Sequence, residues 1–220
     1  MMKKCVIIGA GECNIALLRK RHELKEGDFC IAADGGLKYL IAIGKTPDLL
    51  IGDMDSLGMV EPNGQFKVRR LPVEKDDTDL LAAIKEGLEL GFRKFELYGG
   101  LGGRLDHTIA NIQCLLYLLN RGANGILVGD DMTLRVIRNE AISLPADHYE
   151  AGRKISVFAF GGDAYGVTEK GLKYSVDNVT IRQEFPIGVS NEFIGEDAEI
   201  SVENGMLLIC IQTDELEGFE

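Results

Sequence analysis

Two carboxylates one residue apart follow an apolar segment and have the spacing of a metal site. The chain reads Ile51-Gly52-Asp53-Met54-Asp55-Ser56 directly after a short apolar run. Residues i and i+2 of a strand point to the same side, so Asp53 and Asp55 can converge where the strand ends. Mg²⁺ is typically held by one or two carboxylates plus substrate phosphates. The pair therefore predicts a magnesium site, and the alternative is a polar turn capped by Asp and Ser.

A second acidic cluster, residues 75–79 (Lys-Asp-Asp-Thr-Asp), precedes apolar residues whose spacing predicts an amphipathic helix. Acids favour the N-terminus of a helix, and Asp76 or Asp77 would make a good N-cap. Capping needs one acid, and this segment has three. The surplus indicates that Asp79, one turn into the helix, supplies a third carboxylate to the same metal ion.

A glycine loop, residues 99–103, joins an apolar strand to a long helix that we expect to run from about 106 to 120. A strand, a glycine loop and a helix start together form an anion site, because free N–H groups and the helix dipole both face the loop. We predict that Gly100, Gly102 and Gly103 bind phosphate through their amides, with Arg104 as a planar two-pronged donor. The alternative is a flexible connection. A Walker A loop is excluded, because no Gly-Lys-Ser/Thr follows.

A fourth polar turn, Asp34-Gly35-Gly36, also follows an apolar strand and opens a helix. Asp34 could bind a ribose hydroxyl or the metal, while Gly35 and Gly36 would let a nucleotide approach; a simple strand-to-helix turn is the alternative. Ligands of open parallel sheets bind outside the carboxyl ends of the strands, where all four segments fall. The set therefore predicts one site for a nucleotide and a metal ion.

The elements that must position these residues change in type along the chain. Up to about residue 130, apolar strands alternate with helical patterns, which predicts a three-layer α/β domain with a parallel sheet. Its expected strands are 5–8, 29–33, 49–51, 95–98 and 126–128, and its expected helices are 14–22, 36–43, 78–90 and 107–120.

From about residue 131, short β-branched segments are separated by Gly, Asn and Asp, which predicts an antiparallel β-sandwich. The expected strands are 133–137, 154–160, 179–185, 198–202 and 206–211. We therefore expect residues 1–130 to form a domain that binds a nucleotide and Mg²⁺, which the family resemblance described below makes an ATP-binding catalytic domain, and residues 131–220 to form a second, β-sandwich domain, with the boundary between Gly129 and Met132.

Composition narrows the class of protein. The chain has 220 residues, 45% of them hydrophobic, and its net charge is −11. This charge argues against binding to nucleic acid or to an anionic membrane, since both need a basic surface. The apolar runs fall far short of a membrane span and the N-terminus is no signal peptide, so we expect a cytoplasmic protein. Five cysteines without a C-x-x-C pair indicate reduced thiols and no zinc site.

Taken together, the motifs resemble the thiamine pyrophosphokinase family. The resemblance is carried by Ala-Asp-Gly-Gly at 33–36, Gly-Asp-Met-Asp-Ser at 52–56, Asp-x-Thr-Asp at 76–79, Gly-Gly-Arg-Leu-Asp at 102–106, Gly-Leu-Lys-Tyr at 171–174 and Gly-Val-Ser-Asn-Glu-Phe at 188–193. It implies transfer of the β,γ-pyrophosphoryl group of ATP to the hydroxyethyl oxygen of thiamine, giving thiamine diphosphate and AMP. It also implies a homodimer with thiamine bound between the α/β domain of one subunit and the β domain of the other.

The chemistry asks for positioning and charge neutralisation more than covalent help. Asp53, Asp55 and Asp79 would hold Mg²⁺, and Arg104 would stabilise charge as AMP departs. Asp106 is the candidate to orient or deprotonate the attacking hydroxyl, or else a helix N-cap.

In the β domain, Ser190, Asn191 and Phe193 are the expected thiamine contacts. Asn191 could pair with a ring nitrogen and its amine, while Phe193 could pack on a ring face. The alternative is a β turn at Ser190 and Asn191 with Phe193 in the core.

The sequence departs from the family pattern at two places. Leu37-Lys38 stands where a small residue and Asn are frequent, which weakens the expected nucleotide contact there, and Phe193 stands where some members have Trp, which weakens the expected stacking on the thiamine ring.

Three other functions compete with the one that the resemblance implies. A pyrophosphokinase for a pterin alcohol would share the phosphate machinery, and a non-catalytic thiamine or nucleotide sensor would keep the fold. A haloacid-dehalogenase-type phosphatase would place its Asp-x-Asp in the first strand, whereas in this chain the motif follows the third predicted strand.

Overall fold

The computed structural model describes residues 3–21, 28–52, 66–71 and 77–212. These residues divide between Asp130 and Asp131 into two compact units, an α/β unit and a β unit. No helix within the described ranges is long and apolar enough to cross a membrane.

The α/β unit is built on six parallel strands in the order β6-β5-β1-β2-β3-β4. Their bounds are β1 Cys5–Ile8, β2 Phe29–Ala33, β3 Leu49–Gly52, β4 Lys67–Arg70, β5 Lys94–Tyr98 and β6 Asn124–Val128. The chain adds β2, β3 and β4 on one side of β1, then returns to add β5 and β6 on the other. The direction of winding therefore reverses between β1 and β5, which is where sheets of this kind bind ligands.

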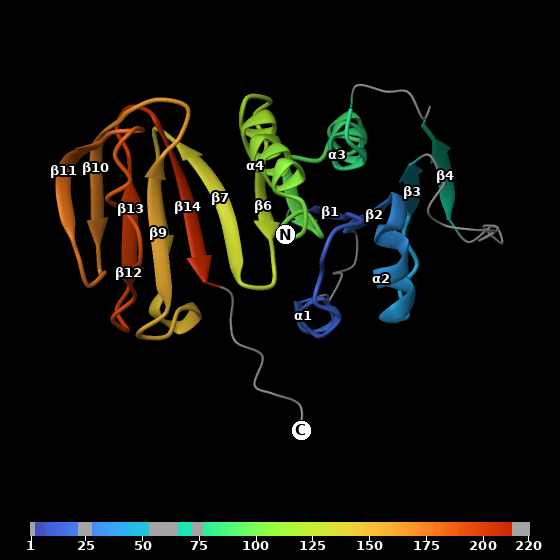
Figure 1. Cartoon of the computed structure of the whole chain (residues 1–220), viewed down its shortest axis with the longest axis horizontal. Coiled ribbons are helices and arrows are strands. Elements are labelled where there is room, and N and C mark those ends of the chain that lie inside the picture. The colour runs from blue at the N-terminus through green and yellow to red at the C-terminus, as the bar shows by residue number, and fades with distance from the viewer. Residues whose placement is uncertain (1–2, 22–27, 53–65, 72–76, 213–220) are drawn as a thin grey trace. The chain divides into compact units, whose positions relative to one another are not determined.

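Helices cover both faces of this sheet (Figure 1). Helices α1 (Ile15–Arg21) and α2 (Leu37–Ala42) pack on one face, where Val6 and Ile8 of β1 join one buried cluster with Leu18 and Leu40. Helices α3 (Asp79–Glu89) and α4 (Leu105–Leu119) cover the other face. The alternation along β1 explains this division, because successive strand residues point to opposite faces.

Two four-stranded antiparallel groups make up the β unit, ordered β12-β9-β14-β7 and β11-β10-β13-β8. The strands are β7 Met132–Arg138, β8 Ala141–Leu144, β9 Lys154–Ala159, β10 Ala164–Lys170, β11 Val176–Ile181, β12 Asn191–Glu192, β13 Ala198–Ser201 and β14 Met206–Gln212. Short 3₁₀ turns occur at Asp34–Gly36 and Ala146–His148. Inward-facing apolar residues of both groups form a single core, as in a β-sandwich.

The fold class predicted from the sequence is confirmed, and most helices and strands lie within two residues of their predicted bounds. One strand was wrong: the segment expected at 179–185 is β11, Val176–Ile181, and Phe185 lies in a turn in which its amide donates to the carbonyl of Arg182. The sequence pattern also missed β4, β8, β10 and β12. All four residues of β4 are exposed, so its sequence has no apolar alternation to reveal it.

Candidate active site

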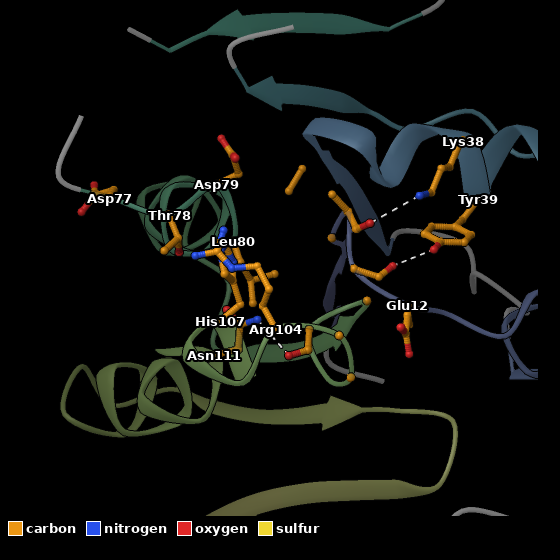
Figure 2. Close-up of a pocket in the computed structure, with 18 residues that line it drawn as sticks. Glu12, Lys38, Tyr39, Asp77, Thr78, Asp79, Leu80, Arg104, His107 and Asn111 are labelled. Carbon is orange, nitrogen blue, oxygen red and sulfur yellow. Dashed lines mark hydrogen bonds between the residues drawn. The ribbon is translucent and has the colours of Figure 1, made fainter. Parts of the chain in front are cut away.

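A cavity of about 520 Å³ lies in the α/β unit beside the carboxyl ends of β1 and β5. Its walls (Figure 2) are formed by the loop 9–12 after β1, Ala33 at the end of β2, residues 38–39 of α2, the start of α3, and the loop 99–104 with the first turns of α4. Its volume falls in the range of roughly 300–1,000 Å³ that encloses a nucleotide-sized ligand. The cavity therefore sits where the strand order predicts a ligand.

Backbone contacts hold the two central loops together. The amide of Gly9 donates to the carbonyl of Tyr98 at 2.7 Å, and that of Gly11 donates to the carbonyl of Gly99 at 3.0 Å. Gly99 has φ 65°, and a Cβ on it would lie 2.5 Å from the carbonyl oxygen of Gly9. Only glycine fits this crossing, so the glycines here serve close packing of two loops as well as ligand approach.

The glycine loop is also fixed from the side of α4. Asn111, which is buried, donates from Nδ2 to the carbonyl of Gly100 at 2.8 Å, and Thr108 donates from Oγ1 to the carbonyl of Gly102 at 3.3 Å. Gly100, Gly102 and Gly103 line the cavity together with Arg104. Side chains of α4 therefore bond two carbonyls of the loop, which restricts its conformation.

Arg104 and Asp106 form a two-pronged ion pair. Arg104 donates from Nε to Oδ1 of Asp106 at 3.1 Å and from Nη2 to Oδ2 at 2.6 Å. Both side chains are largely exposed, so water screens the pair and a phosphate can replace the carboxylate. Hydrogen bonding to Arg104 lowers the pKa of the Asp106 carboxyl, and a hydrogen bond from the His107 amide acts in the same direction.

Asp106 is not the cap of its helix. Helix α4 begins at Leu105 and its N-cap residue is Arg104, which puts the carboxylate of Asp106 inside the first turn. Asp106 therefore does not fill the N-cap position considered for it from the sequence. Its ionised carboxylate lies beside a guanidinium that itself lines the cavity.

The acidic cluster before α3 divides its roles among three residues. Thr78 is the N-cap and accepts from the amide of Leu81 at 3.2 Å, so the N-cap expected at Asp76 or Asp77 was wrong for the described Asp77. Asp77 accepts from Nζ of Lys85 at 2.7 and 2.5 Å. Asp79 is the first residue of α3 and lines the cavity.

The predicted metal ligands can be placed only in part. Asp53 and Asp55 lie outside the described residues, although β3 ends at Gly52, directly before them. Within the described ranges, no group of three or more His, Cys, Asp or Glu could hold a metal ion. Asp79 nevertheless supplies a carboxylate at the cavity wall, and carboxylate oxygen is the donor that Mg²⁺ requires.

The segment Asp34-Gly35-Gly36 lies beside the cavity wall rather than in it. Asp34 has φ 47°, and a Cβ on Gly52 would lie 3.0 Å from the Cβ of Asp34, so this residue borders the end of β3. A Cβ on Gly36 would lie 1.9 Å from the carbonyl oxygen of Ile8. Gly36 therefore lets the 3₁₀ turn pack against β1, and neither Gly35 nor Asp34 is among the residues lining the cavity.

Several lining residues were not among the predicted site residues, including Glu12, Lys38, Tyr39 and Asn111. Tyr39 donates from its hydroxyl to the carbonyl of Gly11 at 2.6 Å, and Nζ of Lys38 lies 3.4 Å from the carbonyl oxygen of Ala10 (Figure 2). The sequence signal for Glu12 was the predicted strand 5–8, whose carboxyl end must share an edge with the other strand ends. Lys38 and Tyr39 lie on α2 and contact the loop after that strand. Lys38 also puts a cation at the second of the two positions, Leu37-Lys38, at which the sequence departs from the family pattern.

The β unit has a smaller cavity of about 130 Å³, formed by β10, β11 and residues 187–191. Asn191 lines it and is buried. Ser190 is exposed with φ 61°, and its amide donates to Oγ of Ser156 at 3.1 Å. Phe193 is 1% exposed and stacks on Tyr149 with ring centroids 4.7 Å apart, so it belongs to the core of this unit.

Asn191 stabilises the β unit, because its side-chain amide group makes four hydrogen bonds. Its Oδ1 accepts from the amides of Tyr174 and Glu192, both at 2.9 Å, and its Nδ2 donates to the carbonyl of Tyr174 at 2.8 Å and to Oε2 of Glu169 at 3.1 Å. These four bonds use both donors and both acceptor sites of the Asn side chain.

We expect Asn191→Ala to lower the free energy of unfolding by roughly 1–3 kcal/mol, because buried groups lose their partners. Urea titration followed by circular dichroism measures it. Asn204→Ala, at an exposed position of the same unit, is the control and should stay within about 0.5 kcal/mol of the unmodified protein. Equal stability of the two variants would contradict the structural role.

The fold and the cavity define a class: a two-unit protein whose α/β unit offers a nucleotide-sized, anion-accepting site at the switch point of a parallel sheet. The family model of the thiamin pyrophosphokinase catalytic domain matches residues 21–127, and that of the thiamin pyrophosphokinase vitamin B1 binding domain matches residues 141–207. The chain therefore belongs to the thiamine pyrophosphokinase family and is an enzyme of this class.

Individual relatives agree with this assignment. The chain is 31% identical over 195 residues to a thiamine pyrophosphokinase of Bacillus subtilis, covering 84% of this chain and 87% of that protein. The crystal structure of thiamine pyrophosphokinase from Bacillus subtilis matches with a TM-score of 0.86 at 27% identity, covering 96% of this chain and 100% of that one. That from Geobacillus thermodenitrificans matches with a TM-score of 0.82 at 26% identity, covering 96% and 98%.

Proposed function

We propose that this protein transfers the β,γ-pyrophosphoryl group of ATP to the hydroxyethyl oxygen of thiamine, giving thiamine diphosphate and AMP. The observation that carries the proposal is the cavity at the β1/β5 switch point, where a glycine loop, Arg104 and an acidic helix start meet in a chain of this family. Proteins of the family make thiamine diphosphate with ATP as the co-substrate. ATP and thiamine are therefore the two substrates proposed here.

The α/β unit would bind ATP. Backbone amides of Gly100, Gly102 and Gly103 would hold phosphate oxygens, and Arg104 would turn from Asp106 to the phosphates as AMP departs. Asp79, with Asp53 and Asp55, would hold Mg²⁺, which when bound neutralises phosphate charge. Asp34, Gly35 and Gly36 would border the nucleotide from the neighbouring strand end.

Asp106 is proposed to orient or deprotonate the hydroxyl of thiamine. The exchange of Arg104 from carboxylate to phosphate would remove the guanidinium that lowers the pKa of Asp106. Asp106 would then be a stronger base at the stage when ATP is already bound, which favours ATP binding before the proton is taken.

The β unit, residues 131–220, would read the acceptor through the segment that contains Ser190, Asn191 and Phe193. Ser190 is the exposed member and the direct contact, while Asn191 and Phe193 would shape the site from within the unit. A left-handed conformation at a non-glycine residue such as Ser190 is costly and is concentrated at functional sites. We also propose a cytoplasmic homodimer that binds neither nucleic acid nor membrane, in keeping with the net charge of −11.

Mass analysis of the products formed from Mg-ATP with thiamine, or with a pterin alcohol, tests the function. We expect thiamine to gain two phosphate groups and AMP to appear in equal amount. If only the pterin alcohol is pyrophosphorylated, the acceptor is a pterin alcohol rather than thiamine, and the proposed mechanism of pyrophosphoryl transfer stands. A protein that binds thiamine or ATP without releasing AMP would be a sensor, and the proposal would be wrong.

A further inference from the structure

The cavity of the β unit contains a buried carboxyl group, and the protein pairs one of its two oxygens. Glu169 lies on β10 and is only 5% exposed, yet it lines this cavity. Its neighbours across the sheet are Val176 of β11 and Ile200 of β13, both apolar. A buried carboxyl among apolar residues costs folding free energy unless its oxygens are hydrogen-bonded.

Within the described residues, only one of the two carboxyl oxygens of Glu169 has a hydrogen-bond partner. Oε2 accepts from Nδ2 of Asn191 at 3.1 Å, and no hydrogen bond to Oε1 is found among the described residues. Within the same residues, Oε1 is also not one of the fully enclosed polar atoms that lack a partner, so it keeps access to the cavity that Glu169 lines. Burial raises the pKa of the carboxyl, and the hydrogen bond from Asn191 opposes this only partly.

Asn191 cannot take over the role of the polar group in this cavity. Both of its N–H donors are used, one by Glu169 and one by the carbonyl of Tyr174, and its oxygen already accepts two backbone amides. Its effect on the cavity is to hold Oε2 of Glu169 and so to direct Oε1. Of the two buried polar side chains that line the cavity, Glu169 therefore has the unused capacity, while the Tyr174 side chain, which also lines the cavity, is largely exposed.

The remaining walls favour a flat apolar ring. Val179, Ile181 and Ile187 line the cavity, and its volume of about 130 Å³ is well below the roughly 300 Å³ at which sites begin to enclose a whole drug-sized ligand. One aromatic ring with a small substituent fits the space, whereas a nucleotide does not. A ring that enters must bring a hydrogen-bond donor to Oε1, or the carboxyl stays unpaired.

We propose that Glu169 is a specificity-determining residue that reads the aminopyrimidine ring of the acceptor, whose exocyclic amine donates a hydrogen bond to Oε1. The inference rests on the proposed function, because it takes thiamine as the acceptor. The apolar walls contact the ring and its methyl group, and the carboxyl distinguishes an amine from other substituents at that position. The resulting hydrogen bond completes the pairing that Asn191 begins.

The test compares thiamine with an analogue that carries an oxo group in place of the pyrimidine amine. Isothermal titration calorimetry gives the affinities, and AMP release gives KM and kcat. The unmodified protein should prefer thiamine by roughly 10- to 100-fold, since the analogue leaves a buried carboxyl unpaired. In Glu169→Leu the preference should fall to about threefold or less, with KM for ATP unchanged.

Glu169→Gln gives the sharper result. Because Nδ2 of Asn191 is a donor, the Gln oxygen must face it, which turns the Gln NH₂ toward the cavity. This variant should bind the oxo analogue better than thiamine, an inversion that a loss of folding cannot produce. Glu199→Gln is the control, because Glu199 is an exposed acid on the adjacent strand β13 and should keep the original preference.

Each outcome decides one of two questions. Retention of the original preference in Glu169→Gln and Glu169→Leu, or an equal loss of affinity for both ligands, would overturn the role of Glu169. If the unmodified protein binds thiamine with the expected preference but releases no AMP, the proposed function fails and Glu169 keeps its role. If the unmodified protein does not bind thiamine, both are wrong.

Discussion

Replacing Asp79 with Asn is expected to lower kcat for thiamine-dependent AMP release by at least about 100-fold, because a carboxylate at the cavity wall would be lost from the proposed Mg²⁺ site. Asp53→Asn and Asp55→Asn should each have an effect of the same order. The Mg²⁺ concentration for half-maximal rate should rise in all three variants. Steady-state kinetics at several Mg²⁺ concentrations measures both quantities.

The three variants should remain folded. Asp79 is the first residue of α3, so its charge favours the helix dipole by about 0.3–1 kcal/mol, which corresponds to a fall in Tm of about 1–4 °C. Glu89→Gln removes an acid from the other end of the same helix, at an exposed position, and should keep kcat. Near-normal turnover in all three Asp variants would remove the metal site from the proposal.

The strands that position this cavity were predictable because their residues form short apolar runs. Cys5–Ile8, Phe29–Ala33 and Leu49–Gly52 are buried at nearly every position, as parallel strands between two helix layers must be. Their apolar runs are therefore continuous and stand out in the sequence. The order of the polar turns at their ends then predicts a common edge without any knowledge of tertiary contacts.

Other elements could not be read in this way. β4 has four exposed residues and lies at the edge of the sheet, where charged side chains protect the free backbone groups. β10 is interrupted by Gly166 and carries Thr168 and Glu169, so its buried face includes an acid and shows no apolar alternation. Exposed edges and buried polar groups are the two cases in which side-chain pattern and strand geometry disagree.

Competition between neighbouring residues decided the finer features of the site. Three acids and one threonine could cap α3, and Thr78 is the cap, which leaves Asp77 to pair with Lys85. Sequence alone does not rank these possibilities, because each residue type caps well. The same holds for Asn191, whose capacity to bind a ring could be known only after its four internal hydrogen bonds were seen.

Arg104→Lys is expected to lower kcat/KM for ATP by about 100-fold. An ammonium group cannot reproduce the two-pronged contact that the guanidinium makes with Asp106 and, by the proposal, with phosphate oxygens. Tm should hardly change, since the pair with Asp106 is exposed. Arg121→Lys, just beyond the other end of α4, makes the same exchange away from the cavity and is the control.

The pH dependence separates a phosphate ligand from a residue that only orients Asp106. Arg104 lowers the pKa of Asp106, so Arg104→Gln should raise that pKa toward its ordinary value and move the acid limb of kcat/KM to higher pH. If Arg104 binds phosphate, the loss in kcat/KM should persist above that limb, where Asp106 is ionised in both proteins. A loss confined to the acid limb would mean that Arg104 serves Asp106 alone, and full activity of both Arg104 variants would make it a solvated loop residue.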